Sequence, residues 1–441
     1  MNILPHPSVE RAPALPAPDA GRRLFYGWVL VGALALTETI SYGILAYAFP
    51  VFLGPMQAEL GWSRTALTGA FSLAMLISGL AAIPAGRWVD RHGARALMTA
   101  GSIAAALLVL AWSRVESLPA FYLIWAGIGV TMAAVLYEPA FAVVATWFVR
   151  YRGRALTLLT FLAGFASVIF IPLAAWLVAV QGWRVALVTL AAVLAVGTVL
   201  PHALLLRRSP RELGLAPDGR SPAASPDEGA EAVEQSERSI PAREAMRSAS
   251  FRWLTTAFAM SAFAGTAILV HLIPYLTDRG YSPGFAAAAT GMIGIMALPG
   301  RLIFTPLGGF WPRPRVTAAI FALQALGLLA LLVARDTVGV WVFVVLFGAG
   351  FGAITPARAA LIAEFYGPAH YGAIGGALAL ALALARALAP VGTSVLHDVA
   401  GGYPLVLGGL ALVSAAAALA VLRMAPRSPA TATPRVSEVR A

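Results

Sequence analysis

The chain has 441 residues, of which 59% are apolar and only 12% are charged. Soluble globular proteins carry about 25% charged residues, and the mean hydropathy here is +0.80. This balance excludes a disordered chain, an ordinary soluble enzyme and a nucleic-acid-binding domain, despite the net charge of +11. The chain contains neither Cys nor Lys, which excludes disulfides, Schiff-base chemistry and a Walker-type ATP site.

Twelve apolar segments of roughly 18 to 28 residues are long enough to cross a bilayer. They are 26–53, 65–85, 96–113, 119–146, 155–179, 184–206, 252–276, 285–308, 316–334, 338–363, 372–396 and 403–422. Alternating strands of about ten residues, the pattern of an outer-membrane barrel, are absent from the sequence. The sequence therefore predicts an all-α membrane protein with 12 transmembrane helices.

The distribution of arginine predicts the orientation of these spans. With the N-terminus placed inside, 23 of the 31 Arg residues fall in inside segments, 5 in outside loops and 3 within spans. Short cytoplasmic loops of membrane proteins carry the excess of basic residues. We therefore expect a multi-pass protein of the bacterial inner (plasma) membrane with both termini in the cytoplasm.

The longest hydrophilic stretch follows the sixth span and divides the chain six plus six. Its middle, 221–238, is rich in Pro, Ser and Glu and is expected to be disordered. Its end resembles a short amphipathic helix that Ser239 could cap. The expected domains are a cytoplasmic tail, a six-helix bundle, a cytoplasmic linker, a second six-helix bundle and a second cytoplasmic tail, at 1–25, 26–206, 207–250, 251–422 and 423–441.

The two halves resemble each other at an offset of about 219 residues. Gly-Trp-Ser at 61–63 matches Gly-Tyr-Ser at 280–282, and Pro139 matches Pro356. A repeat that occurs twice is the organisation of a transporter whose site lies between its halves. We expect the two bundles to be pseudo-symmetric.

Between spans two and three, the sequence GRWVDRHGAR at 86–95 contains five patterned residues, Gly86, Asp90, Arg91, Gly93 and Arg95. Gly86 lets another helix approach closely, Asp90 can meet a helix N-terminus or an Arg cluster, and Gly93 lets the loop reverse. The pattern resembles the signature of the major facilitator superfamily. The corresponding place in the second half, 308–315, keeps glycines and Arg but lacks the Asp. The alternative is a charged turn that obeys the positive-inside rule.

Three features resemble the monocarboxylate and oxalate:formate transporter branch of that superfamily. They are the segment 47–80, the Gly300-Arg301 pair in span eight, and Arg386 midway along span eleven. The resemblance implies that Arg301 binds a substrate carboxylate and that Arg386 supplies a second positive charge. The proton-coupled animal members have an Asp one turn before the span-eight Arg, where this chain has Ala297.

A charged side chain at mid-membrane costs roughly 2.5 to 3.5 kcal/mol on insertion scales. Six ionisable residues lie within spans, and they are Glu38, Glu138, His271, Arg301, Arg358 and Arg386. In the superfamily fold, their spans line or flank the central cavity. Three Arg against two Glu leave a net charge of +1, which favours an anionic ligand.

The sequence leaves alternatives open for the three arginines. Arg301 alternatively snorkels to a membrane face, and Arg386 alternatively bonds to carbonyls near Pro390. Arg358 either forms an ion pair with Glu138 across the two halves or snorkels.

The other candidates also have two interpretations each. Glu38 either carries a proton or holds an Arg, or it is a helix-packing group hydrogen-bonded beside two neighbouring threonines, which we favour slightly. His271 is either an interfacial residue or a proton relay. The hydroxyls of Tyr42 and Tyr137 can donate hydrogen bonds to a ligand, although Tyr is common near membrane faces.

The sequence predicts a secondary active transporter that moves a small organic anion, a mono- or dicarboxylate, by alternating access. The substrate-binding candidates are Arg301, Arg386, Tyr42, Tyr137 and His271. The coupling or gating candidates are Glu38, Glu138, Arg358, Gly86, Asp90, Arg91, Gly93 and Arg95. We expect a monomer in the lipid bilayer, with a proton or an exchanged anion left open as a second partner and with no catalytic residue, metal, cofactor or nucleic acid. The alternative is a major facilitator exporter of drugs or amphipathic metabolites.

Overall fold

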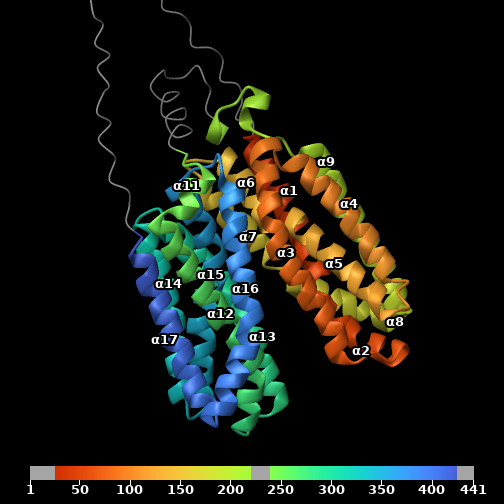
Figure 1. Ribbon diagram of the computed structural model, residues 1–441, viewed down its shortest axis with the longest axis vertical. Coiled ribbons are helices and arrows are strands. Elements are labelled where there is room, and N and C mark those ends of the chain that lie inside the picture. The colour runs from red at the N-terminus through yellow and green to blue at the C-terminus, as the bar shows by residue number, and fades with distance from the viewer. Residues whose placement is uncertain (1–24, 220–238, 425–441) are drawn as a thin grey trace, which may run out of the picture.

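The computed structural model describes residues 25–219 and 239–424, and within these ranges the chain is helical without a strand (Figure 1). The first half contains α1 (Tyr26–Tyr42), η1 (Gly43–Tyr47), α2 (Phe49–Leu60), α3 (Arg64–His92), α4 (Ala94–Trp112), α5 (Leu118–Val135), α6 (Tyr137–Trp147), α7 (Arg152–Ala163), α8 (Ala166–Leu194), η2 (Ala195–Val199) and α9 (Leu200–Leu205). The connecting segment contains η3 (Pro210–Leu213), η4 (Pro217–Gly219) and α11 (Ala242–Arg247). The second half contains α12 (Ala249–Asp278), α13 (Pro283–Leu307), α14 (Arg313–Val333), α15 (Thr337–Tyr366), α16 (Tyr371–Ala400) and α17 (Tyr403–Leu422).

These helices confirm the predicted all-α membrane fold of two six-helix bundles, which lie side by side in Figure 1. Among the described residues, 11 helical stretches are long and apolar enough to cross a membrane. One of them, Arg152–Leu205, is 54 residues long and contains two spans, because Gly182 breaks it with φ 74° and ψ 162°. Glycine reaches this positive φ without the steric cost of a Cβ.

The connecting segment and the tails lie largely outside the described residues, including the stretch 221–238 that we expected to be disordered. The helix predicted after that stretch is shorter than expected, since α11 covers Ala242–Arg247. Our expectation that Ser239 caps it is wrong, because Pro241 occupies the N-cap position. The Ser239 hydroxyl instead accepts a hydrogen bond from the backbone N–H of Ala369, at 3.3 Å.

Four spans of the first half are interrupted within the membrane-spanning length, span six by the π-helical turn η2. Span one changes to the π-helical turn η1 directly after Tyr42, span four breaks at the extended residue Leu136, and span five breaks after α7 at Gly164. Pro139 explains the break in span four, because it has no N–H to offer the carbonyl of Val135. In the second half, α12, α15 and α16 each run as one helix. Interrupted helices mark binding sites in transporters.

The two bundles converge at the end of the molecule that carries the turns 91–95, 150–154 and 313–315, which we call the Arg-rich end (upper end of Figure 1). Near this end, α3 packs directly on α16 through small residues. Gly86 touches the backbone of Gly372, and Gly376 touches the carbonyl of Ala82. A Cβ added at either Gly86 or Gly376 would collide with the facing backbone. Close approach of this kind depends on small residues in both helices.

The α3–α16 contact leads to a prediction for Gly376→Val. The new side chain would push against Ala82 and hold the two helices apart. Because the chain has no Cys of its own, cross-linking between cysteines introduced at Gly79 and Ala383, which face each other, reports this separation directly. We expect cross-linking to fall several-fold in Gly376→Val and to stay unchanged in Gly408→Val, whose site on α17 is open. Equal cross-linking in all variants would contradict the packing.

Candidate functional site

Three tyrosines of the first half gather where its spans are interrupted. Tyr42 ends α1, Tyr47 ends η1, and Tyr137 begins α6 after the break at Leu136. The ring centroids of Tyr42 and Tyr137 are 4.7 Å apart, and those of Tyr42 and Tyr47 are 6.3 Å apart. None of the three hydroxyls is hydrogen-bonded to a described residue, so all three can donate to a ligand.

Arg386 of α16 is a cation that interacts electrostatically with Tyr42 and Tyr47 and that lacks a partner among the described residues. Its side chain is exposed although it lies midway along a membrane span, and it has no hydrogen bond or ion pair with a described residue. Its charge interacts electrostatically with Tyr42, Tyr47, Glu138 and Arg358. The predicted alternative, a bond to carbonyls near Pro390, is not what the structure shows. Arg386 is thus a charged side chain at mid-span that no described residue covers or pairs with.

Glu138 and Arg358 form the ion pair across the two halves that the sequence suggested. Arg358 Nη2 donates to Glu138 Oε1 at 2.5 Å, and the two side chains are only 9% and 15% exposed. The second carboxylate oxygen of Glu138 is buried without a hydrogen-bond partner in the described structure and faces Gly375 of α16. Arg358 therefore does not snorkel, and its charge is compensated within the protein.

Arg301 also reaches across the two halves, but its acceptors are backbone carbonyls. Its Nε donates to the carbonyl of Gly352, at 3.1 Å, and its Nη1 donates to the carbonyl of Thr160 in α7. The Thr160 carbonyl lies in the last turn of α7, where the helix dipole favours a positive charge. Arg301 is thus held at the break in span five and does not snorkel.

Glu38 is fully buried on α1, and neither of its carboxyl oxygens has a hydrogen-bond partner among the described residues. The neighbouring hydroxyls of Thr37 and Thr39 donate to the carbonyls of Leu34 and Ala35 instead. The helix-packing interpretation that we favoured is therefore not what the structure shows. A buried carboxylate without a partner is costly, whereas the neutral acid is less so.

Asp90 joins the two halves at the Arg-rich end. Its Oδ1 accepts from the N–H of Gly372 at 2.7 Å, and its Oδ2 accepts from the N–H of Ala373 at 2.8 Å. Both donors belong to the first turn of α16, whose own N-cap residue His370 provides no side-chain cap. Asp90 thus caps a helix of the opposite half, which satisfies N–H groups that the helix itself cannot pair.

The remaining residues of the 86–95 pattern have local roles. Gly93 has φ 82° and lies between α3 and α4, and a Cβ there would meet the side chain of Arg208. Arg208 donates to the carbonyl of Arg91 at 2.7 Å. The side chains of Arg91 and Arg95 are exposed.

His271 lies apart from the tyrosine group, between α12, α16 and α17. Its ring nitrogens are 3.4 Å from the Tyr403 hydroxyl and 3.4 Å from the Pro390 carbonyl. The Pro390 carbonyl can only accept, so the ring donates from Nε2 in that contact. The structure does not bring His271 into contact with the other substrate-binding candidates.

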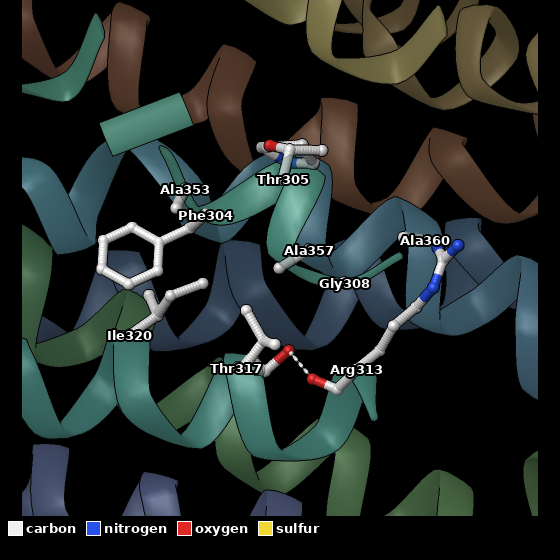
Figure 2. Close-up of a pocket in the computed structure, with 11 residues that line it drawn as sticks. Phe304, Thr305, Gly308, Arg313, Thr317, Ile320, Ala353, Ala357 and Ala360 are labelled. Atoms are coloured by element: carbon white, nitrogen blue, oxygen red, sulfur yellow. Dashed lines mark hydrogen bonds between the residues drawn. The ribbon is translucent and has the colours of Figure 1, made fainter. Parts of the chain in front are cut away.

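A pocket within the second half, lined by α13, α14 and α15, lies near the Arg-rich end (Figure 2). Figure 2 shows Arg313 at one end and Phe304 and Ile320 at the other. Arg313 forms an ion pair with Glu364 at 2.7 Å. The pocket has a volume of about 20 Å³ for a water-sized molecule, which is room for about one water, so it cannot hold an organic anion. Among the described residues, no cluster of His, Asp and Glu could hold a metal.

The sequence did not indicate that the side chain of Arg152 is buried and hydrogen-bonded. Arg152 was expected within an Arg-rich loop, but its side chain is buried and donates to the carbonyls of Phe148 and Ala145, at 2.9 and 3.1 Å. Those carbonyls belong to the end of α6, where a cation is favoured. Its position in the sequence did not distinguish it from Arg150 and Arg154, which lie in the same loop.

Comparison with known proteins places this geometry in context. The sequence matches the Major Facilitator Superfamily over residues 34–390. It is 25% identical over 395 residues to YcxA, an uncharacterized MFS-type transporter of Bacillus subtilis, covering 86% of this chain and 87% of that protein. It is 24% identical over 422 residues to human monocarboxylate transporter 2, covering 90% of this chain and 84% of that protein.

The fold resembles that of the Escherichia coli fucose:proton symporter FucP. A structure of FucP in the outward conformation superposes with a TM-score of 0.70 at 17% identity, covering 91% of this chain and 100% of that one.

The buried ion pair leads to a prediction about stability. Glu138→Gln or Arg358→Gln alone leaves one charge buried without a partner, so each should lower the free energy of unfolding by about 3–5 kcal/mol. The double substitution removes both charges and should cost less than either single change. The exposed pair Glu59–Arg184 is the matched control, since exposed pairs contribute about 1 kcal/mol or less. Thermal unfolding of the purified variants checks this, and additive single effects would contradict it.

Proposed function

Since the chain belongs to the Major Facilitator Superfamily, we propose that it is a secondary active transporter of a small organic anion and that Arg386 binds the anion. The observation that carries this proposal is an arginine at mid-span that is exposed and unpaired within the described structure. Tyr42 and Tyr47, whose hydroxyls are free, interact electrostatically with Arg386. The ring of Tyr42 also contacts those of Tyr47 and Tyr137. A guanidinium holds a carboxylate through two parallel hydrogen bonds, and phenol hydroxyls add further donors.

The pairing of the other charges supports a ligand with one carboxylate. Glu138 compensates Arg358, and two backbone carbonyls hold Arg301. The positive charge left for a ligand is that of Arg386. A dicarboxylate would need Arg301 to leave the Thr160 carbonyl and turn to the ligand. The likeness to human monocarboxylate transporter 2 also favours a monocarboxylate.

Alternating access follows from where the inter-half contacts lie. Asp90, Glu138 and Arg301 all join the halves toward the Arg-rich end, whereas Arg386 stays exposed. With the Arg-rich end in the cytoplasm, as the excess of basic residues favours, this arrangement is closed inside and open outside. Transport then requires the inner contacts to break while the opposite ends of the bundles approach.

Glu38 provides a route for coupling to protons. Its carboxyl is buried and unpartnered in this arrangement, so binding a proton there stabilises the state described here. Its electrostatic interaction with Glu138 links its protonation to the inter-half ion pair. We propose that Glu38 takes up a proton when the protein is open outside.

The anion site is tested by uptake of labelled mono- and dicarboxylates into proteoliposomes. Arg386→Ala should weaken the apparent affinity by about 10- to 100-fold, because a charge-assisted hydrogen bond is lost. Arg301→Ala and Arg301→Lys should lower the maximal rate more than the affinity for a monocarboxylate, because Arg301 holds an inter-half contact. For a dicarboxylate, Arg301 and Arg386 should matter about equally.

Arg335→Ala is the matched control, since that arginine lies in the exposed turn between α14 and α15. Near-normal uptake in Arg386→Ala would contradict the anion site, whatever the effect of Arg301→Ala. Efflux of a lipophilic cation that depends on Glu38 or Glu138 would then support the exporter alternative.

Glu38→Gln tests proton coupling separately. The amide cannot exchange a proton, so uptake driven by an imposed pH gradient should be lost. Exchange of internal for external substrate at equal pH should persist, because Gln keeps the size and neutrality of the protonated acid. Uptake in Glu38→Gln that still responds to the pH gradient would exclude this residue as the proton carrier.

A further inference from the structure

The segment that follows span six folds back onto the Arg-rich end through Asp218. This residue lies in η4, in the sequence Pro217-Asp218-Gly219, with φ 63° and ψ 9°. Asp218 is the one residue other than glycine that has a positive φ among the described residues. Side chains with a Cβ seldom adopt this conformation unless the surroundings hold them there. The contacts of the Asp218 carboxylate show what holds it.

The Asp218 carboxylate accepts hydrogen bonds from three consecutive backbone N–H groups. These belong to Val149, at 3.3 and 3.2 Å to the two oxygens, Arg150, at 2.8 Å, and Tyr151, at 3.2 Å. They form the turn that leads into α7, whose N-cap residue Tyr151 provides no side-chain cap. The charge of the buried Arg152 also interacts with Asp218. The carboxylate therefore holds the turn directly before α7 and lies near the positive end of the α7 helix dipole.

An aspartate also binds backbone N–H groups at the start of the equivalent helix of the second half. The helices α7 and α16 begin at Arg152 and Tyr371, which are 219 residues apart and so match the internal repeat. Asp90 caps α16 from the turn between α3 and α4. By pseudo-symmetry, an acid in the turn between α13 and α14 would cap α7, but segment 308–315 has no acidic residue. Asp218 does not take that position, because the repeat would place Gly153 and Arg154 opposite Gly372 and Ala373, but it holds the turn 149–151 directly before them.

The helix that follows this turn, α7, carries the contacts of the first half with α13 and α15. The carbonyl of Thr160 in α7 accepts from Arg301 of α13, and the charge of Arg152 interacts with Arg313 and Glu364. The position of α7 therefore decides whether Arg301 finds its acceptor. A contact that fixes the start of α7 therefore also fixes the first-half side of the closed Arg-rich end.

The other described end of the connecting segment docks beside α16. The Ile240 N–H donates to the Tyr366 carbonyl at 3.1 Å, and Ser239 Oγ accepts from the Ala369 N–H at 3.3 Å. Both acceptor and donor lie in the turn between α15 and α16. The segment is thus anchored at the turns that precede the two equivalent helices, α7 and α16.

We propose that Asp218 is a positioning residue for transport, which holds the turn that leads into α7 and stabilises the arrangement closed at the Arg-rich end. The connecting segment then takes part in gating and is more than a tether between two bundles. This role rests on alternating access and is independent of the substrate, so a non-anionic substrate would leave it intact.

The experiment measures how fast a maleimide labels a cysteine introduced at Ala82, which is 3% exposed and packed against Gly376 of α16. Asp218→Gly removes the carboxylate but keeps the positive φ available, because glycine adopts it freely. We expect the labelling rate in the full-length protein to rise about tenfold, as for the loss of one charge-assisted contact that stabilises the closed state. Asp218→Asn, which keeps one acceptor oxygen, should lie between Asp218→Gly and the parent.

Glu212→Gly is the matched control, because Glu212 is an acid of the same segment that accepts from the Arg208 N–H at 3.2 Å and does not contact α7. Its labelling rate should equal that of the parent. A purely structural contact would lower the melting temperature of Asp218→Gly without raising the labelling rate, and that result would overturn the proposal. An equal rise in Glu212→Gly would overturn it as well. If Asp218→Gly fails to fold, the labelling rate of Asp218→Asn is compared with that of the parent instead, and a rate equal to the parent's would overturn the proposal.

Discussion

A polar group within the hydrocarbon region costs free energy unless it is satisfied inside the protein, because lipid offers no hydrogen bonds. In this chain, several of those partners lie on the opposite half of the molecule. Asp90 pairs with the first turn of α16, Arg301 pairs with the last turn of α7, and Glu138 pairs with Arg358. If the halves separate at the Arg-rich end, all of these groups lose their partners at once. Separation is therefore favourable only when water replaces the lost partners, so opening and hydration of that end occur together.

Arg386 is an exception to this pattern of partners across the two halves. It lies on the same helix that Asp90 caps, but it has no partner among the described residues and stays exposed. An anion bound there would be held by α16 and by the tyrosines at the interrupted spans of the first half. The ligand and the cap thus act on one helix, which allows binding at mid-membrane to bias the contact at its end. Such coupling requires only that the ligand binds the two arrangements with different affinity.

The sequence predicted much of the fold because the bilayer imposes a length and a charge pattern on every span. The Glu138–Arg358 pair was also foreseeable, since each residue lies beside a proline at equivalent places of the repeat. The acceptors of Arg301 could not be predicted, because they are backbone carbonyls, which every residue has whatever its side chain. Asp218 lies in a polar stretch whose composition indicates a linker, and its partners are again backbone groups. The break at Leu136 falls at a residue with no turn preference, and only Pro139 hints at it.

The central claim is that the two ends of the molecule open reciprocally and that the contacts at the Arg-rich end set the balance. Distances between paired spin labels test it most directly, because the chain has no native cysteine. One pair, Ala96→Cys with Arg315→Cys, spans the Arg-rich end, and the other, Glu116→Cys with Arg335→Cys, spans the opposite end; all four positions are exposed. In the Asp90→Asn background, the account predicts that the first distance lengthens and the second shortens in the same fraction of molecules. A change at one end without the reciprocal change at the other would contradict it.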